Sequence, residues 1–202
     1  MKIVGEHSWL LGFDDEHERK ANERARAAAA FLRSLSPAGL VEVIPAARTL
    51  FVEGSPAFDA GILVGLEGSD LEAVQPLPGE HQIRISLDGE DLPEVTAALG
   101  LSPQAFGEAF LAETFTVGFL GFSPGFAYLY GLPQNLQLPR RRTPRLKVPA
   151  QSLAMAGPYV GIYPAAMPGG WNLLGTAEGI FFDVSRRPPA LFSPGDTVRF
   201  VR

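Results

Sequence analysis

Cysteine is absent from this chain, and basic side chains are outnumbered by acidic ones. Without cysteine there is no thiolate nucleophile, no disulfide framework, no thiolate zinc site and no cysteine-ligated iron–sulfur cluster. A net charge of −5 argues against a nucleic-acid partner, because phosphate binding needs a surplus of Lys and Arg. No run of eighteen apolar residues occurs, so we expect neither a membrane span nor a signal peptide, and a cytoplasmic globular protein.

The first part of the sequence, up to residues 75–80, is typical of a small α+β domain. Residues 3–13 predict a strand, and Asp14 or Asp15 is expected to cap an alanine-rich helix that follows to residue 35. Residues 40–46 and 48–54 alternate in polarity and predict two further strands. A helix lying across one face of a small sheet follows from this order.

The remainder is dominated by short strands. The segment QPLPGE, residues 75–80, is the predicted linker, which gives domains over residues 1–76 and 77–202. A strand at 81–89 and two helices at 91–100 and 102–113 come first. Further strands are predicted at 114–122, 152–157, 160–165, 171–176, 179–184 and 196–202. Close spacing of short strands between Gly, Pro and Asn predicts an antiparallel barrel or sandwich.

The stretch GFLGFSPGFAYLYGLP, residues 118–133, is rich in glycine and aromatic side chains. Its glycines and the SPG turn predict a strand that runs into a looped crossover. The aromatic residues, which include Phe119, Phe122, Phe126 and Tyr128, are either core of the β domain or a rigid wall of a substrate pocket.

The segment PRRRTPRLKVPA, residues 139–150, concentrates positive charge. Its basic residues are Arg140, Arg141, Arg142, Arg145 and Lys147. One interpretation is a solvated basic loop. The other is a binding site for a carboxylate or phosphate, because the prolines hold the guanidinium groups in extended geometry before an anion arrives. On the second interpretation, replacing Arg145 with Ala weakens ligand binding and leaves folding intact.

Five blocks of sequence carry a family resemblance. They are GLVEVIPAARTLFV, GFLGFSPGFAYLYGLP, PRRRTPRLKVPA, GIYPAAMPGGWNLLG and PPALFSPGDTVRFV, in this order along nearly the whole chain. They resemble the family of 5-oxoprolinase B subunits, which also contains allophanate hydrolase subunit 1, carboxyltransferase subdomain C and the sporulation kinase inhibitor KipI.

The resemblance implies a fold, partners and a reaction. The expected fold is a small N-terminal α+β domain followed by a cyclophilin-like antiparallel β-barrel. The expected partner is a protein similar to the 5-oxoprolinase C subunit, in some members with a third subunit, and the complex couples ATP hydrolysis to opening of the lactam of 5-oxoproline. Because this chain has no Gly-rich loop with Lys-Ser or Lys-Thr, ATP is expected to bind only through the assembled complex.

The resemblance also implies a pocket for a small carboxylate or amide ligand. The residues it assigns to substrate binding are Phe122, Pro124, Phe126, Tyr128, Arg140, Arg141, Arg145, Tyr163, Gly169, Gly170 and Trp171. Arginines supply charge, the PGG backbone supplies N–H groups, and Trp171 or Phe126 supplies a flat face for an amide. His81 is a weak catalytic candidate, for which a structural role is the simpler interpretation, and no metal-ligand spacing occurs.

The chain also departs from the family pattern, at positions where polar residues are usual. Phe110, Phe115, Tyr159, Met167 and Thr176 stand where the family usually has His, Tyr, Gln, Ser and Arg. Loss of hydrogen-bond donors from a catalytic pocket is costly, so these changes favour an alternative: a non-catalytic regulatory protein that binds a histidine kinase. Prolyl isomerase activity, which rests on barrel analogy alone, is a third and weaker interpretation.

Overall fold

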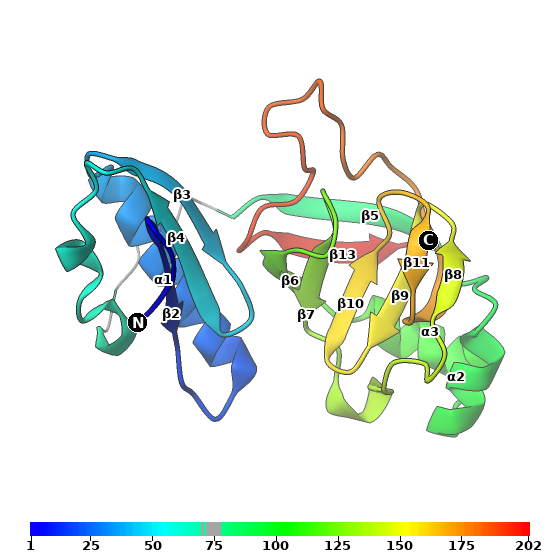
Figure 1. Cartoon of the computed structure of the whole chain (residues 1–202). Helices are drawn as coiled ribbons and strands as arrows, with labels where there is room; N and C mark the ends of the chain where they lie inside the picture. Colours follow the sequence, from blue (N-terminus) through cyan, green and yellow to red (C-terminus); the bar gives the residue numbers. More distant parts are fainter. Residues whose placement is uncertain (70, 72–77) are drawn as a thin grey trace. The chain divides into compact units, whose positions relative to one another are not determined.

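The computed structural model describes residues 1–69, 71 and 78–202 (Figure 1). The chain forms two compact units, Met1–Pro78 and Gly79–Arg202. The domain boundary predicted between residues 76 and 77 lies outside the described residues, as does part of the predicted linker.

The N-terminal unit is a four-stranded antiparallel sheet with one long helix. Its elements are β1 (Lys2–Gly5), β2 (Ser8–Gly12), α1 (Glu18–Leu35), β3 (Leu40–Pro45), β4 (Thr49–Gly54) and the short 3-10 turns η1 (Ala60–Leu63) and η2 (Leu66–Gly68). The strand order is β1-β2-β4-β3. The single strand predicted over residues 3–13 is therefore wrong: the chain reverses after Gly5, and Ile3 pairs with Trp9 in a hairpin.

Helix α1 packs its alanine-rich side on this sheet. Ala21, Ala25, Ala28 and Leu32 recur at three- and four-residue spacing and are fully buried with the sheet residues. Small side chains bring the helix close to the strands. The predicted cap is wrong: the helix begins after His17, and Asp15 accepts a hydrogen bond from the His17 amide instead of capping the first turn.

The C-terminal unit is built on a closed barrel. Its elements are β5 (Glu80–Ser86), α2 (Leu92–Leu99), α3 (Pro103–Leu111), β6 (Phe115–Leu120), β7 (Ala127–Tyr130), η3 (Gln134–Leu136), β8 (Arg145–Val148), β9 (Ser152–Ala156), β10 (Tyr159–Ile162), β11 (Met167–Gly169), β12 (Asn172–Ala177) and β13 (Thr197–Val201). Seven strands close in the order β10-β7-β6-β13-β5-β12-β9, and β8 and β11 form a separate pair (Figure 1). The predicted fold class, a small α+β unit followed by a β-barrel, is confirmed.

Three local expectations for this unit need correction. The barrel is not antiparallel throughout, because β5 and β13 run parallel. The stretch after β6 returns as β7 in an antiparallel hairpin instead of leaving in a crossover. Residues 179–184, predicted as a strand, contribute only an isolated bridge from Phe182 to Ala190.

A cluster of phenylalanines packs α3 against the barrel core. Phe110 contacts Phe106, Phe115 and Phe200 with ring centroids 5.8, 5.3 and 5.4 Å away. Where β12 crosses β5, a Cβ on Gly175 would lie 1.8 Å from the Ser86 carbonyl oxygen, so only glycine fits at this crossing.

Candidate functional site

The candidate site is a cavity of about 280 Å³ in the C-terminal unit. It is lined by Phe122, Phe126, Tyr128, Arg140, Pro144, Tyr163, Pro168, Gly169, Gly170 and Trp171. Eight of the eleven residues assigned to substrate binding are thus brought together, from the turn before β7, from β7, from the segment before β8 and from the ends of β10 and β11. Pro124, Arg141 and Arg145 do not line it.

Aromatic rings form a rigid wall of this cavity. Phe126 lies edge-on to Tyr163 and to Trp171, with both centroid distances 5.3 Å, and Tyr128 lies 5.5 Å from Trp171. Phe126 and Tyr163 are also fully buried. Phe126 and Tyr163 therefore belong both to the packed core and to the wall of the cavity.

Phe122 stands at the rim in an uncommon backbone conformation. Its φ is +66°, in the left-handed region that non-glycine residues rarely occupy, and 63% of the residue is exposed. Its ring rests edge-on against Phe126 at 5.4 Å. Strained residues persist where the surroundings fix them, and they cluster at ligand sites.

The hydroxyl of Tyr163 is the buried polar group of the cavity. Burial raises the pKa of Tyr163, and a hydrogen bond from the Trp171 backbone and the charges of Arg145 and Arg140 oppose that rise without cancelling it. Burial also raises the pKa of Tyr128. Both phenols therefore keep their protons at neutral pH, and since the Tyr163 oxygen already accepts from Trp171, its O–H is available to donate to a ligand.

These raised pKa values predict alkaline destabilisation. Above about pH 10 the unfolded chain releases tyrosine protons that the folded chain retains, so the free energy of unfolding falls as the pH rises. Tyr163→Phe removes one such proton. We therefore expect the free energy of unfolding to fall less steeply with pH in this variant, by up to about 1.4 kcal/mol per pH unit. Urea unfolding at about pH 9 and about pH 11 measures this; identical slopes in both proteins would contradict it.

The PGG backbone approaches Tyr163 closely. A Cβ on Gly169 would lie 2.2 Å from the Tyr163 hydroxyl oxygen, whereas one on Gly170 would meet Pro144 at an ordinary 3.6 Å. We expect Gly169→Ala to lower the free energy of unfolding by about 1–3 kcal/mol through overpacking. The matched variant Gly170→Ala is expected to change it by less than about 0.5 kcal/mol. Urea titration of both variants is the measurement, and equal losses would show that the Tyr163 contact is not the cause.

Two of the predicted binding arginines are occupied by the protein's own carboxylates. The Asp91 Oδ1 atom lies 2.7 Å from Arg141 Nη1 and 2.6 Å from Arg145 Nη2. Glu94 adds a contact to Arg141 at 3.1 Å, and Glu90 pairs with Arg145. Desolvation alone would lower the pKa of Arg145, but Asp91 and Glu90 outweigh it and raise it. The expectation that the whole basic segment waits in extended form for an anion is therefore wrong for these two residues.

Arg140 differs from its neighbours. It is exposed, it lines the cavity, and within residues 1–69, 71 and 78–202 no carboxylate forms an ion pair with it. Arg140 also borders a second cavity of about 430 Å³, which lies between α2 and residues 138–143 and includes Arg142. Arg140 is therefore the basic residue of the segment that is placed to meet an anion in the candidate site.

His81 has a structural environment. Its Nε2 lies 2.8 Å from Asp196 Oδ2, and its ring packs edge-on against Phe192 at 5.0 Å. Asp196 also accepts hydrogen bonds from the amides of Gly79 and Ser193. The bond joins β5 to the turn before β13, and His81 does not line the cavity, so the geometry agrees with the structural interpretation.

The departures from the family pattern also lie outside the cavity lining. Phe110 and Phe115 are in the core of the C-terminal unit, Thr176 donates to Asp88 at 3.2 Å, and Met167 pairs with Val148 in the β8–β11 ladder. Tyr159 packs on Tyr128. None of the five is among the described residues that line the site. Sequence reasoning had treated these positions as pocket positions, because their depth in the fold is not readable from the chain.

Pro144 and Pro168 belong to the blocks that carry the family resemblance, and they complete the cavity wall. Sequence reasoning missed Asp91. Asp91 was predicted only as the first residue of the helix at 91–100, yet its side chain makes no cap hydrogen bond and contacts the arginines instead. No spacing rule links it to Arg141, which lies 50 residues further on.

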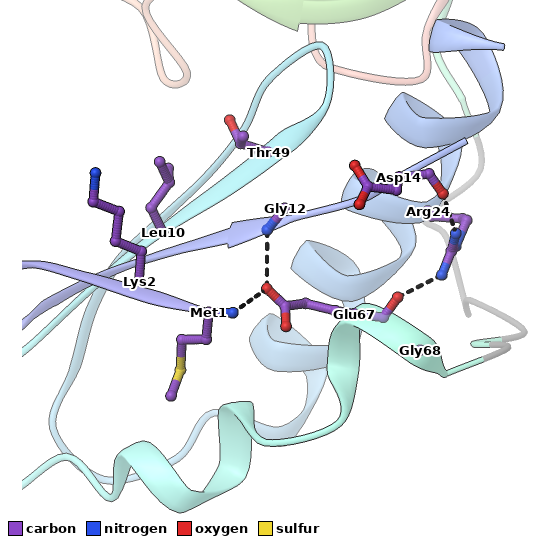
Figure 2. Close-up of a pocket in the computed structure, with 9 residues that line it drawn as sticks. All are labelled: Met1, Lys2, Leu10, Gly12, Asp14, Arg24, Thr49, Glu67 and Gly68. Atoms are coloured by element: carbon purple, nitrogen blue, oxygen red, sulfur yellow. Dashed lines mark hydrogen bonds and ion pairs between the residues drawn. The ribbon is translucent and has the colours of Figure 1, made fainter. Parts of the chain in front are cut away.

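A wider depression occurs in the N-terminal unit (Figure 2). Its volume is about 640 Å³, and Glu67 accepts hydrogen bonds there from the Gly12 amide and the Met1 amine. Arg24 donates to the main-chain oxygens of Asp14 and Glu67. These groups satisfy one another, so we assign the site to the barrel cavity.

Over the described parts of the chain, no group of three His, Asp or Glu residues is placed to hold a metal ion, and no helix has the length and apolarity to cross a membrane.

Comparison with known proteins gives the family of this chain. The family described as "Carboxyltransferase domain, subdomain C and D" matches residues 1–192. The B subunit of 5-oxoprolinase from Escherichia coli O157:H7 is 41% identical over 169 residues, which cover 80% of this chain and 78% of that protein. The 5-oxoprolinase B subunit of Bacillus subtilis (strain 168) is 31% identical over 222 residues, covering 98% and 90%.

Solved structures share the fold of this chain. The crystal structure of TTHA0988 has a TM-score of 0.84 and 40% identity over 96% of this chain, which spans only 39% of that longer protein. The Kluyveromyces lactis urea carboxylase, at 16% identity and a TM-score of 0.72, shares the fold over 99% of this chain. This chain belongs to the carboxyltransferase domain, subdomain C and D, family, together with the 5-oxoprolinase B subunits.

Proposed function

We propose that this chain is the B subunit of an ATP-dependent amide or lactam hydrolase that acts on 5-oxoproline with a C-type partner subunit. The observation that carries the proposal is the cavity itself, where an exposed arginine and a buried phenol meet beside an aromatic wall. Relatives at 41% and 31% identity are named as B subunits of 5-oxoprolinase, which supports the substrate class.

The chemistry of 5-oxoproline suits this cavity. The molecule carries one carboxylate and a flat amide, and the Arg140 guanidinium matches a carboxylate in charge and shape. The Tyr163 hydroxyl is available to donate to the amide oxygen, and Trp171 offers a face for the ring. Gly169 and Gly170 line the same cavity, and we propose that their backbone N–H groups also donate to the ligand oxygens.

The cavity does not supply every group that the reaction needs. None of its lining residues, all of which belong to the described part of the chain, is an Asp, Glu, His or Cys. Opening an amide needs a general base or an activated nucleophile. We therefore propose that the partner subunit provides these groups and that ATP binds through the assembled complex.

The alternative is a regulatory protein that binds a histidine kinase. Its support came from polar residues lost at Phe110, Tyr159, Met167 and Thr176, and these residues lie outside the cavity lining. The alternative therefore has less support than the sequence alone indicated, and it remains one outcome of the experiment.

Reconstitution with the C-type partner tests the proposal. The chain is produced with its partner subunits, and ATP hydrolysis and ring opening are measured with and without 5-oxoproline. We expect turnover only in the full complex, with ATP hydrolysis that depends on 5-oxoproline; each protein on its own is the control. A stable complex without 5-oxoproline-dependent hydrolysis would overturn the proposal, and tight binding to a histidine kinase would favour the alternative.

A further inference from the structure

Asp91 is a buried carboxylate with three hydrogen-bond partners in the C-terminal unit. It is 4% exposed and stands directly before α2. Its Oδ1 atom contacts Arg141 and Arg145, and its Oδ2 atom accepts the Leu173 amide at 2.8 Å. One buried carboxylate therefore ties the start of α2 to β12 and to both ends of the segment 141–145.

The contacts of Asp91 extend through Arg141 and Arg145 to the wall of the candidate site. The Arg141 amide donates to the Gly170 carbonyl at 2.8 Å, and Arg145 pairs with Gly169 in the β8–β11 ladder. Arg140 and Pro144, which line the cavity, immediately precede Arg141 and Arg145 in the chain. Asp91 thus holds the residue that follows each of these two cavity-lining residues.

The same contacts determine the charge that a ligand meets. Arg141 and Arg145 are balanced by Asp91, with help from the exposed Glu90 and Glu94, while Arg140 has no such partner among the described residues. The charge of Arg145 acts on the Tyr163 hydroxyl, so changes at Arg145 are felt inside the cavity. Without Asp91 the cavity would lie beside two further guanidinium groups that only exposed carboxylates balance.

We propose that Asp91 determines the charge specificity of the cavity: together with Glu90 and Glu94 it neutralises Arg141 and Arg145, which leaves Arg140 as the cation at the cavity that has no carboxylate partner among the described residues, and so selects ligands with a single carboxylate over dianions. The inference rests on the proposed carboxylate pocket and adds the class of anion that it accepts. It makes Asp91 a positioning and specificity residue, which acts through the arginines without touching the ligand.

Matched ligands test this inference. Calorimetric affinities are measured for 5-oxoproline, cyclopentanecarboxylate and cyclopentane-1,3-dicarboxylate, the last two sharing one ring and differing in charge. For the wild-type chain we expect the monoanion to bind more tightly. For Asp91→Asn, which keeps the shape and removes the charge, we expect the affinity ratio to shift toward the dianion by about five- to tenfold at low ionic strength.

A second variant tests the same inference if Asp91→Asn does not fold. The double variant Glu90→Gln, Glu94→Gln removes two exposed neutralising charges and is expected to shift the ratio in the same direction by about two- to threefold. The control Glu108→Gln removes an exposed charge of α3 whose hydrogen bond is to Gln104, and should leave the ratio unchanged.

The outcomes separate this inference from the proposed function. If the variants bind the monoanion and keep the wild-type ratio, the role of Asp91 is overturned while the pocket stands. If the wild-type chain binds none of the three carboxylates, the pocket assignment fails and the inference fails with it.

Discussion

Replacement of Asp91 with alanine is expected to lower the free energy of unfolding by about 3 kcal/mol. The carboxylate is buried, and its loss leaves two guanidinium groups and the buried Leu173 amide without their main acceptor. Removing one partner of a buried ion pair costs about 3–5 kcal/mol, and we take the low end because Arg141 and Arg145 are partly exposed to water.

Asp88 provides the matched control for that measurement. It lies three residues earlier, is exposed, and accepts from Thr176 at 3.2 Å. We expect Asp88→Ala to change the free energy of unfolding by less than about 0.5 kcal/mol. Urea titration of both variants measures the free energy of unfolding. If Asp91→Ala lowers it by no more than Asp88→Ala does, the Asp91 contacts do not stabilise the fold.

Arg140→Gln is expected to weaken 5-oxoproline binding by about 10- to 100-fold and to leave stability unchanged. A hydrogen bond to a charged group contributes about 1.5–3 kcal/mol, and Arg140 is the cavity residue that provides one. Because Arg140 is exposed and its side chain makes no ion pair within the described residues, folding does not depend on it. Calorimetric titration with 5-oxoproline gives the affinity.

Arg142→Gln is the control for Arg140→Gln. Arg142 is an exposed arginine two positions away and borders the second cavity instead of the candidate site. Its removal lowers the net charge equally, so we expect less than about a threefold effect. Equal losses in the two variants would mean that a diffuse positive field, and not contact with Arg140, attracts the carboxylate.

Local patterns predicted most of the elements, because the forces that form them act between near neighbours. The alanine-rich helix, the alternating strands β3 and β4 and the helices α2 and α3 all followed from periodicity and helix-forming residues. The hairpin of β1 and β2 was missed because Gly5 is the one glycine near its turn and no proline marks it, and because β2 also pairs with the distant strand β4.

The sequence predicted most of the residues that line the cavity, but it did not predict which arginines form ion pairs with carboxylates of the same chain. The family resemblance of the sequence blocks assigned eight of the residues that line the cavity. The ion pairs of Arg145 with Asp91 and Glu90 join residues more than fifty positions apart, which no local pattern encodes. They also revise the expectation for Arg145→Ala, which we now expect to cost stability as well as binding.

The parallel pairing of β5 with β13 has a consequence for synthesis on the ribosome. β13 lies between β5 and β6, so a nascent chain that has not yet exposed residues 197–201 presents two open strand edges, with Ile83, Ile85 and Phe115 beside them. Such edges are templates for aggregation. The ring of strands closes only when β13 has emerged, and until then β5 and β6 each lack the neighbour that covers their edge.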